Sequence, residues 1–366
     1  MAEAQRLAHH NNFGALRLIL AYAVILSHSP EMLDGSRARE PLVGLGSHIT
    51  LGGLAVDGFF IISGYLIAAS FLSSRSLLVF LRSRVLRIYP AFLLAFAICL
   101  LIVGPIGGGD LRALGLHGGL LEAGKALILV EPSLPGALHS LPIPSLDGSM
   151  WTIRYEFRCY LVVALLGVVG LLDRRGQVLG LTILCYLIAA ALNFSGGLSM
   201  RAGLLHQFVF GVIGDPALLV PLLAIFLSGV CAFLYRDRIS FRGAALALSA
   251  AVSLVAILAL PFPEAAIGTA GCYFLLWVGL GLKSKFLEKI NNDYDFSYGV
   301  YLYAWPIAAL IMLASQRAHL NLSPSALTGL TAVLSTVAGA VSWYGLERPA
   351  LKRKSKRSRM KRIAIA

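Results

Sequence analysis

Residues 14–29 read GALRLILAYAVILSHS, an apolar segment that is interrupted by one arginine, Arg17, and one histidine, His28. An α-helix needs about 20 mostly apolar residues to cross a bilayer, and this segment with its flanks, 13–30, comes close to that length. Ionisable side chains inside such a helix are rare and costly, so each marks a candidate site. The segment therefore predicts a membrane-spanning helix that carries functional basic groups.

The rest of the chain has the same apolar character. Of its 366 residues, 58% are hydrophobic and 13% are charged, whereas a soluble domain has roughly a quarter of its residues charged. We therefore predict an all-α, polytopic membrane protein with about ten transmembrane helices. Their ranges are 13–30, 50–72, 85–106, 151–172, 177–194, 216–235, 241–260, 264–282, 297–316 and 324–347. Two further stretches, 114–130 and 203–214, favour re-entrant or interfacial pieces.

The basic residues predict the orientation of these helices. With ten spans, 23 lysines and arginines fall on the side that holds both termini and six on the other side, while Arg154 and Arg158 are left unassigned. Because cytoplasmic loops carry the excess of basic residues, we expect both termini in the cytoplasm. The net charge of +13 then indicates topology rather than nucleic-acid binding. We expect one integral membrane domain over 1–348 and a basic cytoplasmic tail over 349–366 on anionic lipid.

The cysteines give no sign of a metal site. All five lie inside apolar runs, with no CxxC pair and no spacing typical of metal ligands. We interpret them as small packing residues and expect no metal. They are Cys99, Cys159, Cys185, Cys231 and Cys272.

Arg17 and His28 share one face of the first helix. Eleven residues at 100° each return to within about 20° of the starting direction, and their rise separates the two residues by about 16 Å. This spacing is typical of a route across the membrane. The alternative is that Arg17 extends to the interface and that His28 is an interfacial polar residue.

The second and third helices carry further ionisable groups. Asp57 lies at a depth similar to that of His28, where a carboxylate can orient an imidazole; the alternative is a helix-packing hydrogen bond. Arg84 and Arg87, with Arg82 beside them, lie at the cytoplasmic mouth of the third helix. Two guanidinium groups on one face suit a phosphate or pyrophosphate, and the alternative is ordinary topology-determining charge.

The fourth helix opens with DGSMWTIRYEFRCYL, in which two pairs of residues lie one turn apart. Trp151 pairs with Tyr155, and Glu156 pairs with Tyr160. An acid beside aromatic rings is typical of a carbohydrate site, and ion pairing of Glu156 with neighbouring arginines is the alternative. The helix 297–316 also carries an aromatic stripe, which is more often packing than a site.

Six motifs in order resemble the acyltransferase-3 family of integral membrane acyltransferases over nearly the whole chain. They are the Arg-x10-His of residues 17–28, LAVDGFFIISGYLI, RVLRIYPAF, GSMWTIRYEFRCYL, SYGVYLYAWPI and the terminal YGLERP. The resemblance implies an O-acyltransferase of the bacterial inner membrane. Its donor is normally cytoplasmic acetyl-CoA, and its acceptor is a hydroxyl of an exported glycan, glycolipid or related molecule.

The resemblance also implies roles for the site residues. His28 would be the general base or a transient acyl carrier, and Arg17 its catalytic partner or a support of the CoA channel. Arg84 and Arg87, with Arg82, would bind the CoA phosphates. The remaining candidates are Glu156 and Asp57 in the catalytic surroundings and Trp151, Tyr155 and Tyr160 on the acceptor side.

Two features depart from the family pattern. Many relatives carry a histidine where this chain has Ala304, so the helix 297–316 is given no role beyond forming a wall. The chain also ends soon after the tenth predicted span, so we expect a stand-alone enzyme or one that relies on a separate extracytoplasmic partner.

Two other classes of function remain open at this stage. A polytopic transporter or flippase for a glycan or small polar solute fits buried Arg, His, Asp and Glu equally well. A non-catalytic glycolipid-binding protein is the other. The arginine pair with a histidine deeper in the membrane favours a CoA thioester over both.

Overall fold

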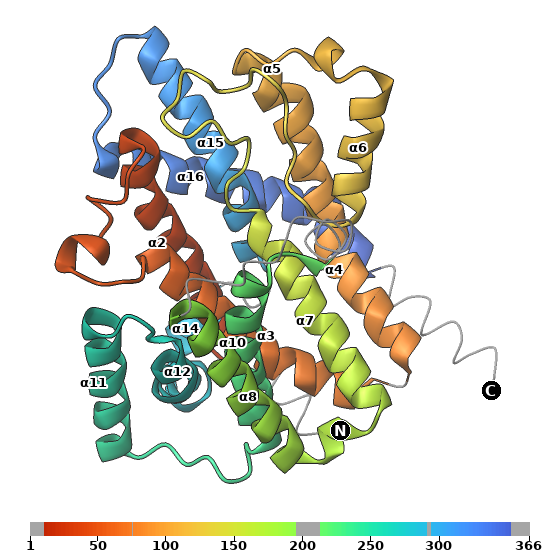
Figure 1. The fold of residues 1–366 in the computed structure, drawn as a ribbon, viewed down its shortest axis with the longest axis vertical. Helices are drawn as coiled ribbons and strands as arrows, with labels where there is room; N and C mark the ends of the chain where they lie inside the picture. Colours follow the sequence, from red (N-terminus) through yellow and green to blue (C-terminus); the bar gives the residue numbers. More distant parts are fainter. Residues whose placement is uncertain (1–10, 75, 195–212, 291–293, 353–366) are drawn as a thin grey trace. The chain divides into compact units, whose positions relative to one another are not determined.

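The structure of the protein is a computed structural model, which describes residues 11–74, 76–194, 213–290 and 294–352 (Figure 1). These residues form helices joined by loops and contain no strand, so the predicted all-α class is confirmed. Among them, eight helical segments are long and apolar enough to cross a membrane. The chain is therefore a multi-pass membrane protein.

Each predicted span corresponds to one helical segment. The segments are α2 (Phe13–Asp34), α3 (Leu51–Leu72), α4 (Leu77–Ile98) continued by η2 (Cys99–Val103) and α5 (Gly104–Ile106), α7 (Trp151–Val168), α8 (Arg175–Phe194), α10 (Pro216–Leu234), α11 (Gly243–Ala259), α12 (Glu264–Ala266) continued by η6 (Ile267–Gly271), α13 (Cys272–Leu276) and η7 (Trp277–Gly281), α15 (Ser297–Arg317), and α16 (Pro324–Ser342) continued by η8 (Trp343–Glu347). Shorter elements are η1 (Val43–Leu45), η3 (Leu111–Leu114), α6 (Gly115–Leu127), η4 (Leu171–Asp173) and α14 (Lys285–Lys289).

Three details refine the predicted spans. Helix α4 begins at Leu77 rather than near residue 85, because arginines lower the hydropathy of its first turns but are good helix formers. Two helices fall outside the eight candidate spans. Helix α7 carries three charged residues, and α11 has only 17 residues. The stretch 114–130 contains α6, whereas nearly all of 203–214 lies outside the described residues.

Contacts divide the chain into two compact units. Unit 1 comprises residues 1–20, 41–77 and 155–292, and unit 2 comprises residues 21–40, 78–154 and 293–366. The boundaries fall inside α2 and α7, so each of these helices contributes residues to both units.

Unit 1 is built around α10, which packs against α3 and α8. Two glycines permit the close approach of α3 and α10. A Cβ atom at Gly64 would lie 2.0 Å from the carbonyl oxygen of Phe226, and one at Gly229 would lie 2.1 Å from that of Ile61. Small residues of this kind let helix backbones meet directly in membrane proteins.

Unit 2 contains α15, the most buried of the candidate spans, packed against α16. Here Gly299 and Gly339 face each other: a Cβ atom at Gly299 would lie 2.6 Å from the Cα atom of Gly339. This packing brings the aromatic residues of α15 into a fixed position.

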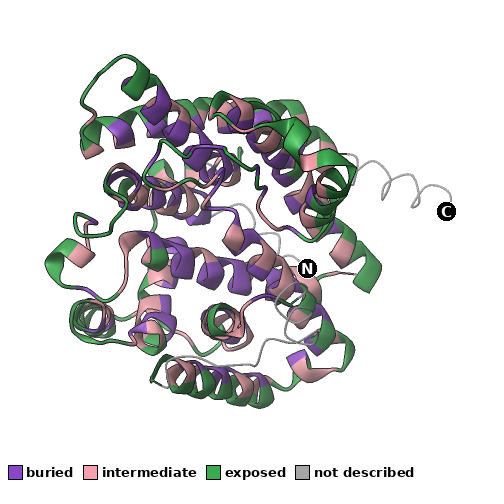
Figure 2. Ribbon diagram, turned by 45° about the horizontal axis from the view of Figure 1, so that its top comes forward, coloured by how far each residue is buried: buried purple, intermediate pink, exposed green. Residues whose placement is uncertain are grey.

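Large apolar side chains lie exposed on helices of both units (exposed residues are green in Figure 2). Leu187 of α8 is 63% exposed, Leu248 of α11 is 65% exposed and Val341 of α16 is 68% exposed. In water such faces would form unusually large apolar patches, whereas lipid tails solvate them. The exposed surface thus agrees with a membrane location.

Candidate active site

His28 lies in the part of α2 that belongs to unit 2, and its side chain is 25% exposed. Its Nδ1 atom is 3.1 Å from Oε2 of Glu31, one turn further along the helix. The other carboxylate oxygen of Glu31 accepts a hydrogen bond of 2.8 Å from Nε of Arg37. Because an ionised carboxylate only accepts hydrogen bonds, this arrangement makes Nδ1 the donor. Nε2, which has no hydrogen-bond partner among the described residues, is then the basic nitrogen.

Glu31 is not among the site residues predicted from the sequence. Its i, i+3 spacing from His28 is a recognised signal for a side-chain pair on a helix, and it could have indicated the contact. The predicted orienting acid, Asp57, is a buried residue of α3 in unit 1. Its predicted action on His28 stays a prediction.

Trp305 of α15 forms a wall beside His28. The two ring centroids are 5.0 Å apart with the planes at 74°, an edge-to-face contact. The indole Nε1 donates a 3.0 Å hydrogen bond to the carbonyl oxygen of Ser145. A Cβ atom at Gly148 would lie 2.6 Å from the indole ring, so the segment before α7 packs directly on this side chain. These contacts hold the indole in one orientation.

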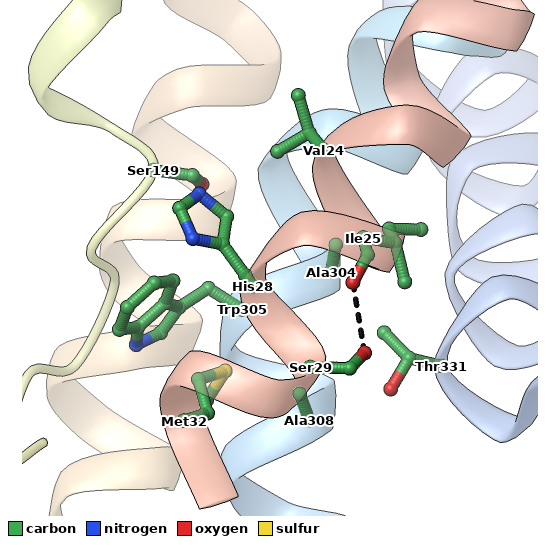
Figure 3. Close-up of a pocket in the computed structure, with 10 residues that line it drawn as sticks. All are labelled: Val24, Ile25, His28, Ser29, Met32, Ser149, Ala304, Trp305, Ala308 and Thr331. Atoms are coloured by element: carbon green, nitrogen blue, oxygen red, sulfur yellow. Dashed lines mark hydrogen bonds between the residues drawn. The ribbon is translucent and has the colours of Figure 1, made fainter. Parts of the chain in front are cut away.

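A small pocket opens beside these rings (Figure 3). Its walls come from α2, α15, α16 and the segment before α7, and most of its lining is apolar. The lining residues are Val24, Ile25, His28, Ser29, Met32, Ser149, Ala304, Trp305, Ala308 and Thr331. Of the polar ones, Ser29 donates through its hydroxyl to the carbonyl oxygen of Ile25 at 2.8 Å, whereas the buried Thr331 hydroxyl has no partner among the described residues.

The segment before α7 is held by a buried hydrogen-bond network. One oxygen of Asp147 accepts bonds from the backbone N–H and the hydroxyl of Ser149, at 2.9 and 2.6 Å. The phenol of Tyr301 donates to the carbonyl oxygen of Ser149 at 2.9 Å and lies 2.7 Å from the hydroxyl of Thr152. Burial raises the pKa of Asp147 to about 7. Nothing in the local sequence pattern around Asp147 indicates that it is buried, so the sequence predicts no role for it.

Glu156 and Tyr160 of α7 meet the second motif helix in unit 1. The same oxygen of Glu156 accepts hydrogen bonds of 2.6 Å from the hydroxyls of Tyr160 and Ser63. Ser63 belongs to the FFIISGYLI stretch of α3. The structure thus joins two motifs that lie far apart in the sequence, and it confirms the predicted pairing of Glu156 with Tyr160.

The other aromatic residues of α7 have different surroundings. Tyr155 is fully buried, and its hydroxyl accepts a 3.0 Å hydrogen bond from the backbone N–H of Asp215, the residue that caps α10. Trp151 is the first residue of α7 and belongs to unit 2. Arg17 is half-buried on α2; since this helix is continuous from Phe13 to Asp34, Arg17 lies about 16 Å from His28 along its axis.

The three arginines of α4 differ in their contacts. Arg82 is exposed. Arg84 donates from Nε to the hydroxyl of Ser83 at 3.1 Å and lies over the ring of Phe80. Arg87 forms an ion pair with Asp295, which precedes α15, and lies 3.6 Å from an oxygen of Glu347 in the terminal YGLERP motif. Arg87 therefore connects three elements of unit 2, a role that its local sequence pattern does not indicate.

The described residues contain no group of three or more His, Cys, Asp or Glu side chains that could hold a metal ion. The five cysteines are all buried and unpaired with one another.

Comparison with known proteins defines the class. The model of a family described as an acyltransferase domain matches residues 10–344. The chain is 27% identical to the O-acetyl transferase of Shigella phage Sf6, over 94% of this chain and 97% of that protein. It is 28% identical to nodulation protein 10 of Rhizobium leguminosarum bv. viciae, over 94% of each chain.

A third relative is the exopolysaccharide production protein ExoZ of Rhizobium meliloti, 26% identical over 84% of this chain and 92% of that protein. No solved structure matches the chain. The fold and the family match together define a membrane-embedded acyltransferase. The chain belongs to the acyltransferase-3 family, as its six motifs predict.

Proposed function

We propose that this protein is an O-acyltransferase of the bacterial inner membrane that moves an acyl group from cytoplasmic acyl-CoA to a hydroxyl of a carbohydrate or glycolipid. The observation that carries the proposal is His28, whose Nδ1 is bonded to Glu31 and whose Nε2 is left as a base beside a pocket. The relatives named as an O-acetyl transferase and an exopolysaccharide production protein support the acyl group and the acceptor class.

In the proposed reaction, Nε2 of His28 accepts the proton of the acceptor hydroxyl as its oxygen attacks the thioester carbonyl carbon. The carbon–sulfur bond then breaks, the electron pair stays on sulfur, and the imidazolium returns the proton to the CoA thiolate. Glu31 stabilises the imidazolium that forms between these steps, because its carboxylate accepts the Nδ1–H bond. Proton and charge are thereby conserved within one turnover.

Guanidinium groups would hold the acyl-CoA donor. Arg82 and Arg84 are assigned to the CoA phosphates, which suits their place in the first turns of α4. Arg87 already pairs with Asp295 and lies near Glu347, so its proposed role is to position α4 for phosphate binding. Arg17, about 16 Å from His28, is assigned to the donor route rather than to the carbonyl.

The acceptor side is proposed around Glu156, which accepts hydrogen bonds from Tyr160 and Ser63. Tyr155 is assigned to its surroundings, and the roles predicted for Trp151 on the acceptor side and for Asp57 in catalysis stay predictions. Acidic groups beside aromatic rings suit sugar hydroxyls and the apolar faces of sugar rings.

The decisive experiment follows label from radioactive acetyl-CoA into the glycan and glycolipid fractions of membranes that contain the protein. His28→Ala should reduce labelling by about 100-fold or more, since general-base catalysis contributes about 10²–10⁴-fold. His117→Ala, at an exposed histidine of α6, is the matched control and should label like the wild type. Equal labelling by His28→Ala at equal expression would refute the mechanism. No labelling together with no acetyl-CoA binding would favour a transporter.

A further inference from the structure

The pocket beside His28 is small and mostly apolar. Its cavity volume is about 10 Å³, which is room for roughly one water-sized group. Methyl and methylene groups of Val24, Ile25 and Met32 and the indole of Trp305 form much of the wall. A sugar ring is both too large and too polar for this space. A methyl group, which is about the size of a water molecule, suits it in size and in chemistry.

Thr331 gives this apolar space one unused hydrogen-bond donor. Its side chain is 1% exposed, and its hydroxyl oxygen has no hydrogen-bond partner among the described residues. Buried hydroxyls in native proteins nearly always have a partner, so an unsatisfied one requires an explanation. The other two hydroxyls of the pocket are engaged, Ser29 with the carbonyl oxygen of Ile25 and Ser149 with Asp147. A ligand with an apolar end and one acceptor oxygen would complete the site.

Two alanines limit the size of such a ligand. Ala304 and Ala308 lie one turn apart on α15 and both line the pocket. The helix itself is fixed by its packing on α16 through Gly299 and Gly339, so the pocket cannot deepen by moving α15. Because the cavity has room for roughly one water-sized group, a chain longer by one methylene would exceed its volume.

We propose that this pocket holds the acyl group of the donor, admits a two-carbon acyl group and excludes longer ones, with Thr331 donating a hydrogen bond to the acyl carbonyl oxygen. The inference rests on the proposed function and specifies its substrate. A hydroxyl that donates to this oxygen stabilises the negative charge that develops there when the acceptor attacks. Thr331 therefore acts on the reacting carbonyl, while Ala304 and Ala308 set the length of the acyl chain.

The test measures transfer from acetyl-CoA and propionyl-CoA in the same membrane preparation. Wild type should prefer acetyl by about 10-fold or more, because one methylene in an apolar pocket changes specificity by about 10–200-fold. Ala308→Gly should reduce that preference to near unity, and Ala308→Val should reduce transfer of both groups. Ala314→Val, at an exposed position of the same helix, should leave the ratio unchanged. The ratio of acetyl to propionyl transfer does not depend on the amount of folded protein in the preparation.

The hydroxyl is tested with Thr331→Val, which keeps the shape of the side chain. This variant should lower kcat for acetyl transfer by about 10-fold or more with little change in KM, and Thr331→Ser should restore most of it. Thr328→Val, at a pocket-independent threonine of α16 whose hydroxyl bonds to Pro324, is the control.

The outcomes separate the two proposals. Three results would overturn the acyl pocket and leave the acyltransferase function intact: equal use of acetyl and propionyl by wild type, an unchanged ratio in Ala308→Gly, or unchanged transfer in Ala308→Val. Full activity of Thr331→Val would show that the hydroxyl binds only water or nothing. Failure of wild type to transfer any acyl group would refute the proposed function and, with it, the pocket assignment.

Discussion

His28 can act as a base only if one ring nitrogen keeps its proton while the other remains available. The contact from Nδ1 to Glu31 meets this condition, and Arg37 supplies a positive charge on the far side of the same carboxylate. The carboxylate thereby selects the tautomer and stabilises the imidazolium that forms in the proposed reaction. The indole of Trp305 limits rotation of the imidazole from the other side.

Replacing Glu31 by glutamine should therefore impair catalysis more than binding. A glutamine amide can either donate to or accept from Nδ1, so the basic nitrogen is no longer defined. We expect Glu31→Gln to lower kcat by about 10–100-fold, with KM for acetyl-CoA changed less than about twofold. Steady-state kinetics of acetyl transfer over a range of pH would measure both parameters.

The matched control is Asp34→Asn, which removes an acid of the same helix that pairs with Arg39 at the exposed end. It should leave kcat within about twofold of wild type, and Glu31→Asp should recover part of the lost activity. A uniform loss in all three variants would mean that Glu31 stabilises the helix end and does not orient His28.

At the scale of the elements, helix packing depends on positions where a side chain cannot fit. The two glycines between α3 and α10 let the backbones touch, and the motif IISGYLI contains one of them, Gly64. Ser63, beside this glycine, donates to Glu156 of α7. The same close packing thus places a motif hydroxyl against a candidate acceptor-side carboxylate.

Gly64→Ala should destabilise the protein because the new Cβ would meet the carbonyl oxygen of Phe226, a backbone atom that cannot move aside. We expect a loss of about 1–3 kcal/mol, the usual cost of overpacking. Thermal melting in detergent would report it as a lower Tm. Gly180→Ala on α8, where nothing lies within 4 Å of the new Cβ, should be neutral or stabilising by up to about 1 kcal/mol. Equal melting of the two variants would contradict the packing argument.

At the scale of the whole molecule, one buried acid links stability to pH. Burial raises the pKa of Asp147 from 3.8 to about 7, so the folded protein holds a proton that the unfolded chain releases. The contribution of this carboxyl group to the free energy of unfolding is fully present below about pH 4. It is lost as the pH rises through 7, where the folded protein also releases the proton. The loss amounts to at most about 4 kcal/mol at alkaline pH.

Asp147→Asn should remove this dependence, since an amide oxygen can accept the same two bonds from Ser149 without becoming charged. Melting curves between pH 4 and pH 8 should show the Tm of wild type falling relative to that of the variant. Asp110→Asn, at an exposed cap of η3, is the control and should run parallel to wild type. A constant difference between wild type and Asp147→Asn across this range would refute the assignment.

The order and approximate ends of the helical segments follow from the sequence, because apolar runs of bilayer length are a local property that survives any tertiary arrangement. Their number as membrane spans is a separate matter: of the ten predicted, eight are long and apolar enough to cross a membrane among the described residues. Relations within one helix also follow from the sequence, because helix geometry fixes them. The examples are the shared face of Arg17 and His28, eleven residues apart, and the pair of Glu156 with Tyr160. The main error of position, the start of α4 at Leu77, arose because arginines resemble loop residues in hydropathy and helix formers in propensity.

The site itself depends on contacts between residues that are far apart in the chain. Trp305 meets His28 across 277 positions, and Asp295 and Glu347 meet Arg87 across 208 and 260 positions. No periodicity encodes such pairs, because burial and side-chain direction are set only when the helices pack. The sequence therefore determined the class of protein and its candidate base, whereas packing determined the pocket beside that base and the partners that orient it.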